Sequence, residues 1–340
     1  MTPERFDELT GRLGDLRAVV VGDFCLDRYF DLKPLSGETS IETGLPVLHV
    51  DEVRNQPGGA GTIVSNLSSL GVGSILPIGF TGTDGEGFEL CRALEATPHV
   101  STELFFQTEE RRAFTYLKPM LPGESSGPEE MSRIDIKNDT ETPLAVREQL
   151  RQLIRGAVAD ADILILLSQV DLPGTGVLHS DVLAELFRLR SHYADAVALG
   201  DSRSGFEAWP SVSLKMNRAE LEQIRGENYD SEEQLEEDLT AFAKDLGQSV
   251  YVTLSDDGFI AADADGDLCS ASAFPVYGEI DVVGAGDAVT ASLASALKAG
   301  ATTKEALDFS MAAASSVLHQ VGTTGQAKLR EMKQLLCPNL

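Results

Sequence analysis

Short apolar runs alternate with amphipathic stretches along most of this chain, and this alternation limits its fold more than any other feature. Five runs are nearly continuous in apolar residues and are predicted to be buried strands: residues 16–22, 74–79, 162–167, 194–199 and 250–254. Strands that are buried on both faces are typical of a parallel sheet between helices. Helical candidates lie near residues 60–70, 84–96, 143–158, 178–192, 217–225, 232–246, 285–298 and 303–319. The alternation predicts a doubly wound α/β domain.

Two regions break the alternation, residues 28–57 and 101–136. Both contain short β-prone pieces, such as 46–50 and 113–117, and neither has a helical period. A small β layer beside the main domain, covering its ligand cleft, would account for both regions. We therefore expect residues 1–340 to form one domain with a β lid drawn from about 28–57 and 101–136.

The composition limits the class of protein. Hydrophobic residues make up 42% of the chain, enough for a substantial core, and there is no run of about 18 apolar residues that would predict a membrane span. The polar N-terminus lacks a signal-peptide core, and the four cysteines form no metal-binding pattern, so we expect a cytoplasmic protein with reduced thiols. The net charge of −27 argues against a nucleic-acid partner, whereas a nucleotide ligand needs only a local cation or Mg²⁺.

The segment Gly284-Ala285-Gly286-Asp287 stands directly before an apolar helical run. A glycine-bearing turn at the start of a helix exposes backbone N–H groups at the positive end of the helix dipole, where an anion can bind. A carboxylate in the same turn can take the proton of an attacking hydroxyl group. An anion site and a base together indicate phosphoryl transfer to an alcohol.

Other phosphate-binding motifs are missing, because the chain contains no GxxxxGK[ST] and no GxGxxG after the first strand. A second glycine pair, Gly58-Gly59, precedes a helical run that contains Thr62. It would let a ligand approach the backbone closely, although it is equally consistent with a plain turn. Asp23 and Asp27 follow the first strand, where open α/β sheets bind ligands. Asp27 would accept hydrogen bonds from sugar hydroxyls, and Asp23 is consistent with a solvated or helix-capping residue.

Asp27, the Gly58-Gly59 turn and the segment 281–287 occur in the order and spacing of the PfkB, or ribokinase-like, carbohydrate kinases, and the chain resembles that family from about residue 16 to about 336. The family's late signature is usually D-T-x-G-A-G-D, and Val282 replaces its threonine here. The resemblance implies a three-layer α/β/α sandwich with a mostly parallel central sheet and a small β lid. It implies an ATP- and Mg²⁺-dependent kinase with Asp287 as the base. The N–H groups of Gly284, Ala285 and Gly286 would stabilise the transferring phosphoryl group.

Within the family, the N-terminal third is most similar to the bacterial D-glycero-D-manno-heptose-7-phosphate kinases. Thr62 stands where the family commonly has a substrate-facing asparagine, and residues 168–174 lack the aromatic and lysine of those kinases. The resemblance implies a sugar or sugar-phosphate acceptor, with one like heptose 7-phosphate favoured, bound by Asp27, Gly58, Gly59 and Thr62. The alternatives are a kinase for another sugar or a nucleoside, or a non-catalytic sugar- or nucleotide-sensing protein on the same fold. The chain ends near residue 340, so we expect no fused nucleotidyltransferase domain.

Asn217 and Glu220 resemble the family's N-x-x-E motif, which organises magnesium through water and the nucleotide phosphates. The same pair is also the pattern of a helix-capping box, and both interpretations are compatible. Lys215, just before them, would contact a phosphate or lie on the surface.

The remaining nucleotide contacts also follow from the resemblance. Thr253, Ser255 and Gly258 are similar to the strand end beside the nucleotide, and Gly322 to the helix end that flanks the adenine. Relatives hold a monovalent cation, such as K⁺, between these segments, and the matching positions here are Asp281, Val283 and Gly322.

Four basic residues of the second β-rich region, Arg111, Arg112, Lys118 and Arg133, are candidates to bind the phosphate of an acceptor that is already phosphorylated. Each alone is equally consistent with the charge that protects edge strands from pairing with other molecules. The β lid would also serve as a homodimer interface, as it does in some relatives.

Overall fold

The computed structural model describes residues 1–123 and 127–338. Within them the main sheet has nine strands in the order β14-β13-β12-β11-β10-β9-β1-β4-β5. Their bounds are β1 Arg17–Gly22, β4 Ser74–Gly82, β5 Phe105–Thr108, β9 Ile163–Ser168, β10 Val197–Ser202, β11 Ser213–Asn217, β12 Val250–Thr253, β13 Phe259–Ala262 and β14 Leu268–Ala271. The seven neighbouring strands β12, β11, β10, β9, β1, β4 and β5 are parallel, and β13 and β14 add an antiparallel edge. The mostly parallel central sheet is confirmed.

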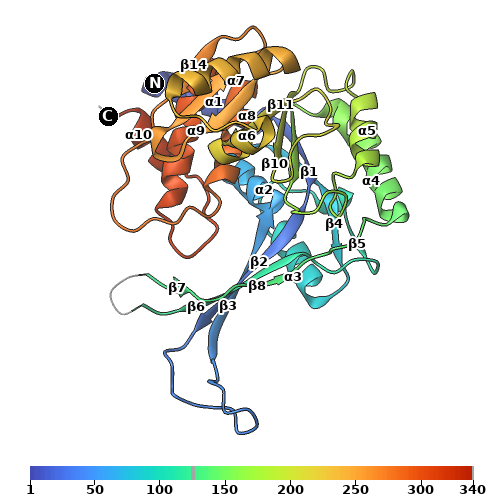
Figure 1. Cartoon of the computed structure of the whole chain (residues 1–340), viewed down its shortest axis with the longest axis vertical. Coiled ribbons are helices and arrows are strands. Elements are labelled where there is room, and N and C mark those ends of the chain that lie inside the picture. The colour runs from blue at the N-terminus through green and yellow to red at the C-terminus, as the bar shows by residue number, and fades with distance from the viewer. Residues whose placement is uncertain (124–126, 339–340) are drawn as a thin grey trace.

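Helices cover both faces of this sheet (Figure 1). One face packs against α1 Pro3–Gly11, α2 Ala60–Ser69, α3 Gly85–Glu95, α8 Ala285–Lys298, α9 Thr303–Leu318 and α10 Leu329–Leu336. The other packs against α4 Leu144–Ala157, α5 Ser180–Arg188, α6 Arg218–Arg225 and α7 Glu232–Leu246. Strand β1 shows why: Ala18 and Val20 enter one core, and Val19 and Val21 enter the other. The three-layer α/β/α sandwich is confirmed.

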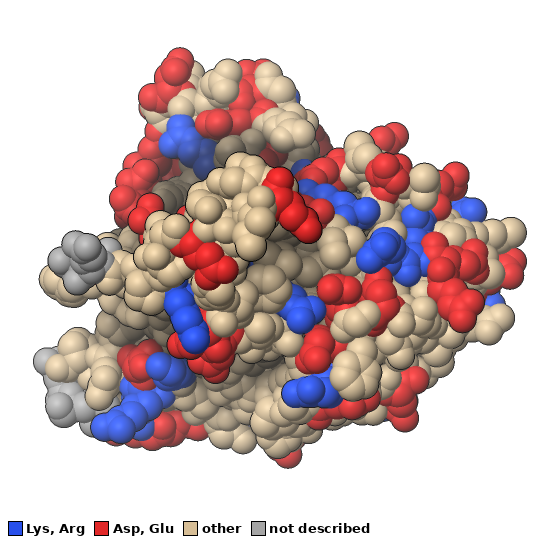
Figure 2. Space-filling view, turned by 90° about the horizontal axis from the view of Figure 1, so that it is seen from below, with Lys and Arg blue, Asp and Glu red and all other residues tan. Residues whose placement is uncertain are grey.

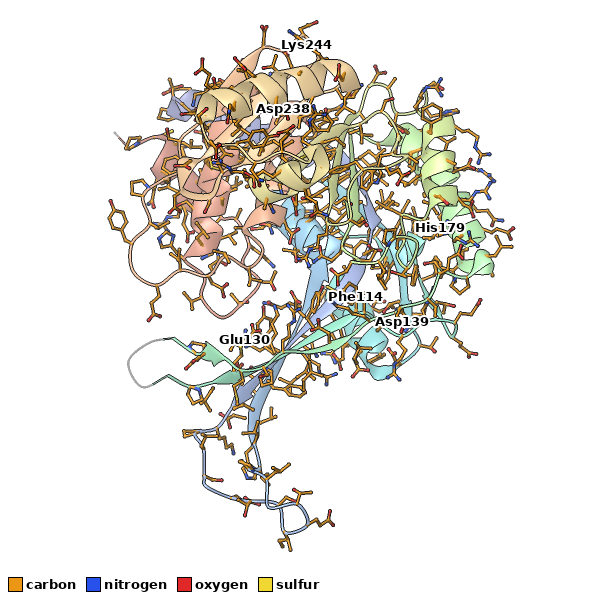
Figure 3. All side chains as sticks on the ribbon, viewed as in Figure 1. Phe114, Glu130, Asp139, His179, Asp238 and Lys244 are labelled. Atoms are coloured by element: carbon orange, nitrogen blue, oxygen red, sulfur yellow. The ribbon has the colours of Figure 1, made fainter. Side chains whose placement is uncertain are left out.

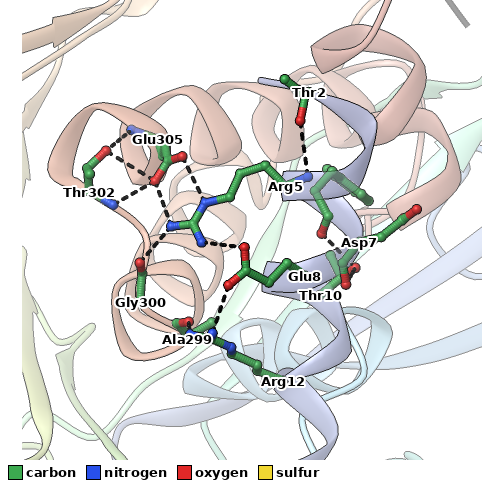
Figure 4. A network of polar contacts seen from close by, with 11 residues as sticks. Thr2, Arg5, Asp7, Glu8, Thr10, Arg12, Ala299, Gly300, Thr302 and Glu305 are labelled. Carbon is green, nitrogen blue, oxygen red and sulfur yellow. Dashed lines mark hydrogen bonds and ion pairs between the residues drawn. The ribbon is translucent and has the colours of Figure 1, made fainter.

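Helix α1, which the sequence analysis did not include, is attached to α9 by a polar network (Figure 4). Arg5 donates from Nε and Nη2 to the two carboxylate oxygens of Glu305 at 2.9 and 3.0 Å, and from Nη2 to the carbonyl of Gly300 at 2.8 Å. Hydrogen bonds from Arg5 lower the pKa of Glu305 to about 2. The N-terminus of the chain is thereby fixed to its C-terminal third.

A second, smaller sheet extends away from the main body (Figure 1). Its strands are β2 Phe24–Leu32, β3 Val50–Gly59, β6 Thr115–Leu121, β7 Glu129–Glu130 and β8 Ile134–Ile136. Their order is β3-β2-β6-β7, with β8 also paired to β6. Between β2 and β3 the chain makes a long excursion, the arm, residues 33–49, which forms the far tip of the molecule in Figure 1. The expectation of a separate small sheet is confirmed.

Three details differ from the sequence-based predictions. The piece 46–50 is not a strand, because Pro46 forms only an isolated bridge with Thr39 and β3 begins at Val50. Part of 101–136 belongs to the main sheet: β5 pairs with β4, and the ring of Phe105 packs edge-on against Phe24 with centroids 5.0 Å apart. The strand predicted at 194–199 starts three residues later, because residues 193–196 form a turn. Residues 124–126 of the expected lid lie outside the described part of the chain.

Candidate active site

A cavity of about 480 Å³ opens where the carboxyl ends of the main-sheet strands face the second sheet. This edge is where open α/β sheets bind ligands. Its lining comes from both sheets and from the start of α8: Asp27, Gly59, Thr62, Tyr116, Lys118, Glu130, Arg133, Leu167, Gln169, Asp201, Arg203, Lys215, Asn217, Glu220, Val282, Val283, Gly284, Gly286, Asp287 and Thr324. Figure 3 shows Phe114 where the second sheet joins the main body and Glu130 on its β7 edge. Most of the residues singled out from the sequence therefore lie around one space.

The turn before α8 has the geometry expected from its glycines. Gly284 is the N-cap and has a φ of 81°, in the left-handed region that favours glycine. A β-carbon there would lie 3.2 Å from the side chain of Thr324 and 3.4 Å from that of Thr62. Gly286 is exposed to the cavity, whereas Ala285 is not among the lining residues and its N–H donates to the Val282 carbonyl at 3.3 Å.

Asp287 lies one residue after this turn, and its electrostatic surroundings suit a proton acceptor. Burial and the negative charge of Asp201 raise the pKa of Asp287 to about 7, against the opposing charges of Lys215 and Arg203. A general base is most effective when its pKa lies near the working pH. Asp287 would therefore accept a proton efficiently near neutral pH.

Lys215 is buried and does not lie on the surface, which corrects one of the two expectations for it. Its ammonium donates to Asp201 at 2.9 Å, and Thr290 donates to the same carboxylate oxygen at 3.1 Å. Burial opposes the charged form, but Asp201 outweighs it, and the pKa of Lys215 is raised. A β-carbon on Gly286 would lie only 3.3 Å from the Lys215 nitrogen, so a fixed positive charge stands beside the glycine turn.

Asn217 and Glu220 form the helix-capping box at the start of α6. Asn217 Oδ1 accepts from the Glu220 N–H at 2.9 Å, and Glu220 Oε2 accepts from the Asn217 N–H at 2.8 Å. Both residues also line the cavity, and burial raises the pKa of Glu220. The capping interpretation is confirmed, and the cap itself presents an amide and a carboxyl to the cavity.

Asp27 lies on the opposite wall, on β2. It is only 5% exposed, accepts from the Thr324 hydroxyl at 2.7 Å and lies 3.6 Å from the Lys118 ammonium. A β-carbon on Gly58 would come within 2.8 Å of the Asp27 carboxyl carbon, so any larger residue there would displace it. Gly59 has a φ of 58° and leads directly into α2, which brings Thr62 to the cavity.

Asp23 was expected to be solvated or to cap a helix, and the structure corrects both expectations. It is 2% exposed and accepts the backbone N–H groups of Gln169 at 2.8 Å, Val170 at 3.3 Å and Val177 at 2.6 Å. Its role is to hold the loop after β9, including Gln169 of the cavity wall. Burial raises the pKa of Asp23, against those three hydrogen bonds.

Of the other expected nucleotide contacts, Thr253, Ser255, Gly258 and Gly322 lie outside the lining of the main cavity. Thr253 pairs with Asn217 across β12 and β11, and Ser255 and Gly258 follow it with φ of 56° and 101°. Asp281, Val283 and Gly322 line an adjoining cavity of about 190 Å³. There the Asp281 carboxylate accepts the N–H groups of Val283 and Gly322, both at 3.0 Å.

The four basic candidates divide into two pairs. Arg111 donates to the hydroxyl and carbonyl of Thr140, at 2.8 and 2.7 Å, and Arg112 lies near Asp84 on a different cavity. Only Lys118 and Arg133 line the main cavity.

Sequence reasoning missed seven lining residues: Tyr116, Glu130, Leu167, Gln169, Asp201, Arg203 and Thr324. Asp201 and Arg203 stand at the carboxyl end of β10 and directly after it, so the argument applied to Asp27 would have found them had the strand been placed three residues later.

Three kinds of comparison place the chain among known proteins. The family model described as pfkB family carbohydrate kinase matches residues 143–329. The bifunctional protein HldE of Paramagnetospirillum magneticum is 30% identical over 330 residues, covering 94% of this chain and 62% of that protein. HldE of Gluconobacter oxydans is 27% identical, covering 94% and 64%. The chain thus spans about three fifths of the length of these curated relatives.

Solved structures share the fold. Arabidopsis thaliana ribokinase, complexed with ribose and ATP, superposes with a TM-score of 0.67 at 21% identity, covering 94% of this chain and 98% of that one. Escherichia coli phosphofructokinase-2, in complex with fructose-6-phosphate, gives 0.70 at 18% identity, covering 94% and 97%.

Proposed function

This chain belongs to the pfkB family of carbohydrate kinases, and we propose that it is an ATP-dependent kinase that transfers the γ-phosphoryl group to a hydroxyl of a sugar or sugar phosphate. One observation carries the proposal: Asp287, with a pKa of about 7, stands directly after a glycine turn and shares a cavity with Asp27 and the Lys215 ammonium. A base, an anion site and a hydroxyl acceptor thus meet in one space.

The acceptor sugar binds at the wall formed by β2 and the start of α2. Asp27 accepts hydrogen bonds from its hydroxyls, because a buried carboxylate with one oxygen toward Thr324 retains further acceptor capacity. Gly58 leaves room for the Asp27 carboxylate that binds the sugar, Gly59 lines the cavity, and Thr62 presents its side chain there.

Catalysis is mostly positioning and charge neutralisation. Asp287 takes the proton of the attacking hydroxyl as the new O–P bond forms. The start of α8, with Gly284 and Gly286, stabilises the charge that spreads over the transferring phosphoryl group, and the Lys215 ammonium adds a positive charge at the same point. The N–H of Ala285 already donates to Val282, so Ala285 contributes only as part of the helix start.

The donor set fits a magnesium–nucleotide complex. Among the residues that the structure describes, no cluster of three His, Cys, Asp or Glu side chains would hold a metal by itself. Mg²⁺ commonly binds through water and phosphates with few protein carboxylates, and Asn217 and Glu220 present an amide and a carboxyl for that role. Bound there, it would neutralise the β- and γ-phosphates. Thr253, Ser255, Gly258 and Gly322 flank the nucleotide.

A monovalent cation at Asp281, Val283 and Gly322 is the finer part of the cofactor proposal, and the residues fit it only in part. Both Asp281 carboxylate oxygens already accept backbone N–H groups. The Gly322 carbonyl accepts from Arg54 Nη2 at 3.0 Å, so a guanidinium already supplies positive charge there. No catalytic step depends on such a cation.

The favoured acceptor resembles heptose 7-phosphate, since the HldE relatives cover almost the whole chain. Another sugar or a nucleoside remains the alternative within kinases. A non-catalytic sensing protein is the alternative outside them, and the raised pKa of Asp287 favours the enzyme, because a sensor has no need of a base.

The second sheet acts as a lid that excludes water from the cavity, since it contributes Asp27, Tyr116, Lys118 and Arg133 to the lining. On this proposal residues 1–340 form a single kinase domain. A second copy of the chain is its proposed partner, bound through the lid, and nucleic acid is not a partner. We place the reaction in the cytoplasm, where ATP is available. The described helices include none that is long and apolar enough to cross a bilayer.

The replacement Asp287→Asn tests the proposed base. It keeps the size of the side chain and removes the proton acceptor, so turnover should fall by about 10²–10⁴-fold while nucleotide binding persists. Coupled ADP release over a panel of sugars and sugar phosphates measures the rate, and titration with ATP measures binding. Asp245→Asn, on the exposed face of α7, is the matched control. A variant at position 287 with near wild-type turnover would refute the role.

A further inference from the structure

One cation in the main cavity has no carboxylate partner. Arg203 follows the end of β10, is exposed to the cavity, and forms no ion pair within 4.0 Å among the described residues. The other cations of the cavity do: Lys215 pairs with Asp201, Lys118 with Asp27 and Arg133 with Asp135. In a chain with a net charge of −27, an uncompensated guanidinium in the candidate active site is a strong indication of an anionic ligand.

The arginine is held in place by a neutral group. With its amide oriented so that the oxygen faces the guanidinium, Gln169 accepts from Arg203 Nη2 at 2.7 Å and from Nη1 at 3.3 Å. Gln169 is itself fixed, because its backbone N–H donates to the buried carboxylate of Asp23. A neutral partner orients the guanidinium without cancelling its charge, which leaves its remaining donors for a ligand.

Tyr116 on β6 gives an independent second observation. It is 5% exposed and lines the same cavity, and its hydroxyl has no hydrogen-bond partner among the described residues. Leaving a buried hydroxyl without a partner destabilises a protein, so an unpaired one at a binding site indicates a polar ligand atom. Burial raises the pKa of Tyr116, so the hydroxyl remains a donor at neutral pH.

Basic groups surround Tyr116. Arg133 stacks on its ring with 4.3 Å between guanidinium and centroid, and the Lys137 ammonium lies 5.7 Å from the centroid. Arg203 lines the same cavity as Tyr116 and Asp287, and its positive charge lowers the pKa of both groups. Asp135 and Asp171 neutralise Arg133 and Lys137, and the surplus positive charge is that of Arg203.

We propose that the acceptor carries a terminal phosphate monoester and that Arg203, together with the Tyr116 hydroxyl, binds it at the cavity wall formed by β6 and the end of β10. This inference rests on the proposed kinase function and names the class of its acceptor. A guanidinium recognises a phosphate through paired N–H donors, and the phenol adds a third. The hydroxyl to be phosphorylated then lies at the other end of the sugar, between Asp27 and Asp287.

The transferring phosphoryl group does not explain the same features. The Lys215 ammonium already stands beside the glycine turn, next to Gly286, and the start of α8 provides the second positive end there. Tyr116 belongs to the second sheet, on the acceptor side of the cavity. It lies opposite Asp27 in the pairing of strands β6 and β2.

Matched pairs of acceptors test the proposal by measuring kcat/KM for a free sugar and for its terminal phosphate: ribose and ribose 5-phosphate, fructose and fructose 6-phosphate, sedoheptulose and sedoheptulose 7-phosphate. We expect the phosphorylated member to be preferred. At pH 8.5, where Asp287 remains ionised even without the Arg203 charge that lowers its pKa, Arg203→Gln should lower kcat/KM for that member by about 100-fold, while the free sugar changes by less than about threefold. Tyr116→Phe, which removes only an unpaired hydroxyl and keeps the ring under Arg133, should cost about tenfold on the phosphorylated member.

Arg92→Gln, at an exposed arginine of α3, is the matched control and should change neither member. Binding of inorganic phosphate provides a readout without turnover. Phosphate should compete with the phosphorylated acceptor for binding to the native protein and should fail to do so in Arg203→Gln. Equal losses on both members of a pair, or a weakened affinity for ATP, would assign Arg203 to the nucleotide and overturn the proposal. A higher kcat/KM for gluconate, whose anionic group is a carboxylate, than for any phosphorylated acceptor would also overturn the proposal. Absence of ADP release with every acceptor would instead count against the kinase function.

Discussion

At Asp287 the local charges oppose one another. Burial and Asp201 favour the protonated acid, while Lys215 and Arg203 favour the carboxylate, and the result is a pKa of about 7. The sequence alone predicted a carboxylate after a glycine turn. It did not predict the value, because Asp201 and Lys215 come from strands β10 and β11 and meet Asp287 only in the folded chain.

The pH dependence of the rate follows from this value. Asp287 acts as a base only when it is ionised, so log kcat/KM should rise with a slope near one up to about pH 7 and level off above it. Rates measured from pH 5.5 to 8.5 at saturating ATP and varied acceptor check this. A rate that stays constant down to pH 5.5 would mean that the group titrating near 7 is not the base.

The Lys215–Asp201 pair gives a prediction about stability. Replacing Lys215 by Met leaves the Asp201 carboxylate buried without its charged partner, which should lower the free energy of unfolding by about 3–5 kcal/mol. The double replacement Lys215→Met with Asp201→Asn should recover much of that loss, because no uncompensated charge remains. Urea unfolding of both variants measures the difference. Equal stability of the single and double variants would show that the pair is not coupled.

At the scale of elements, the segments with strong periodicity were predictable and those held by distant contacts were not. The buried strands and long helices follow from runs of apolar residues, which is why the sandwich could be expected. Strand β11 was missed because Lys215 interrupts its apolar pattern, and the lysine is tolerated there only because Asp201 lies on the neighbouring strand. The hairpin β13–β14 was missed because each of its strands has only four residues, too few to show a clear pattern.

Helix α1 shows how far such contacts reach along the sequence. Arg5 and Glu305 are 300 residues apart, and nothing in the first turn of the helix indicates where it binds. Figure 4 shows that Arg5 joins α1 to Glu305 and to the carbonyl of Gly300.

Arg5→Met should therefore loosen α1 without affecting the cavity. Hydrogen exchange at residues 3–11 should become faster, and kcat should remain unchanged, because the network lies outside the residues that line the cavity. Mass spectrometry of exchange at a fixed pH measures the first, and ADP release the second. Arg330→Met, at an exposed arginine of α10, is the matched control. Unchanged exchange in Arg5→Met would mean that apolar packing of Phe6 and Leu9 alone holds the helix.

On the face of the molecule seen in Figure 2, acidic residues are spread widely, with Lys and Arg in smaller groups among them. The sequence predicted the main sheet and a smaller sheet. It also predicted that the smaller sheet would cover the ligand cleft, but it did not show that Tyr116 would line the cavity together with Asp287, because that depends on the way the two sheets face each other.

The arm suggests how two copies would associate. It presents exposed apolar side chains at Leu35, Ile41 and Leu45, with Ile41 fully exposed and the other two exposed by more than 60%. Apolar groups gathered at the tip of a projecting hairpin are costly in water and favour an interface. The proposed dimer would bury them against the second copy.

Replacing Ile41 by Asp should therefore convert a dimer into a monomer. Sedimentation velocity at micromolar concentration should give about twice the chain mass for the native protein and the chain mass for the variant. Leu268→Asp, an exposed apolar position on β14 of the main sheet, is the control and should remain dimeric. A native protein that sediments as a monomer at that concentration would contradict the proposed interface.

Strands β2 and β3 run from the main body into the second sheet without interruption. β2 begins two residues after β1 ends, β3 passes into α2 with no intervening residue, and the two strands stay paired from Phe24 and Gly59 out to Leu32 and Val50. Such a connection is a continuous two-stranded ribbon, unlike a single-chain linker. We therefore expect the second sheet to move relative to the main body by bending and twisting of the paired strands β2 and β3. On that basis the tip would occupy a continuous range of positions, and a ligand bound between the two sheets would narrow that range.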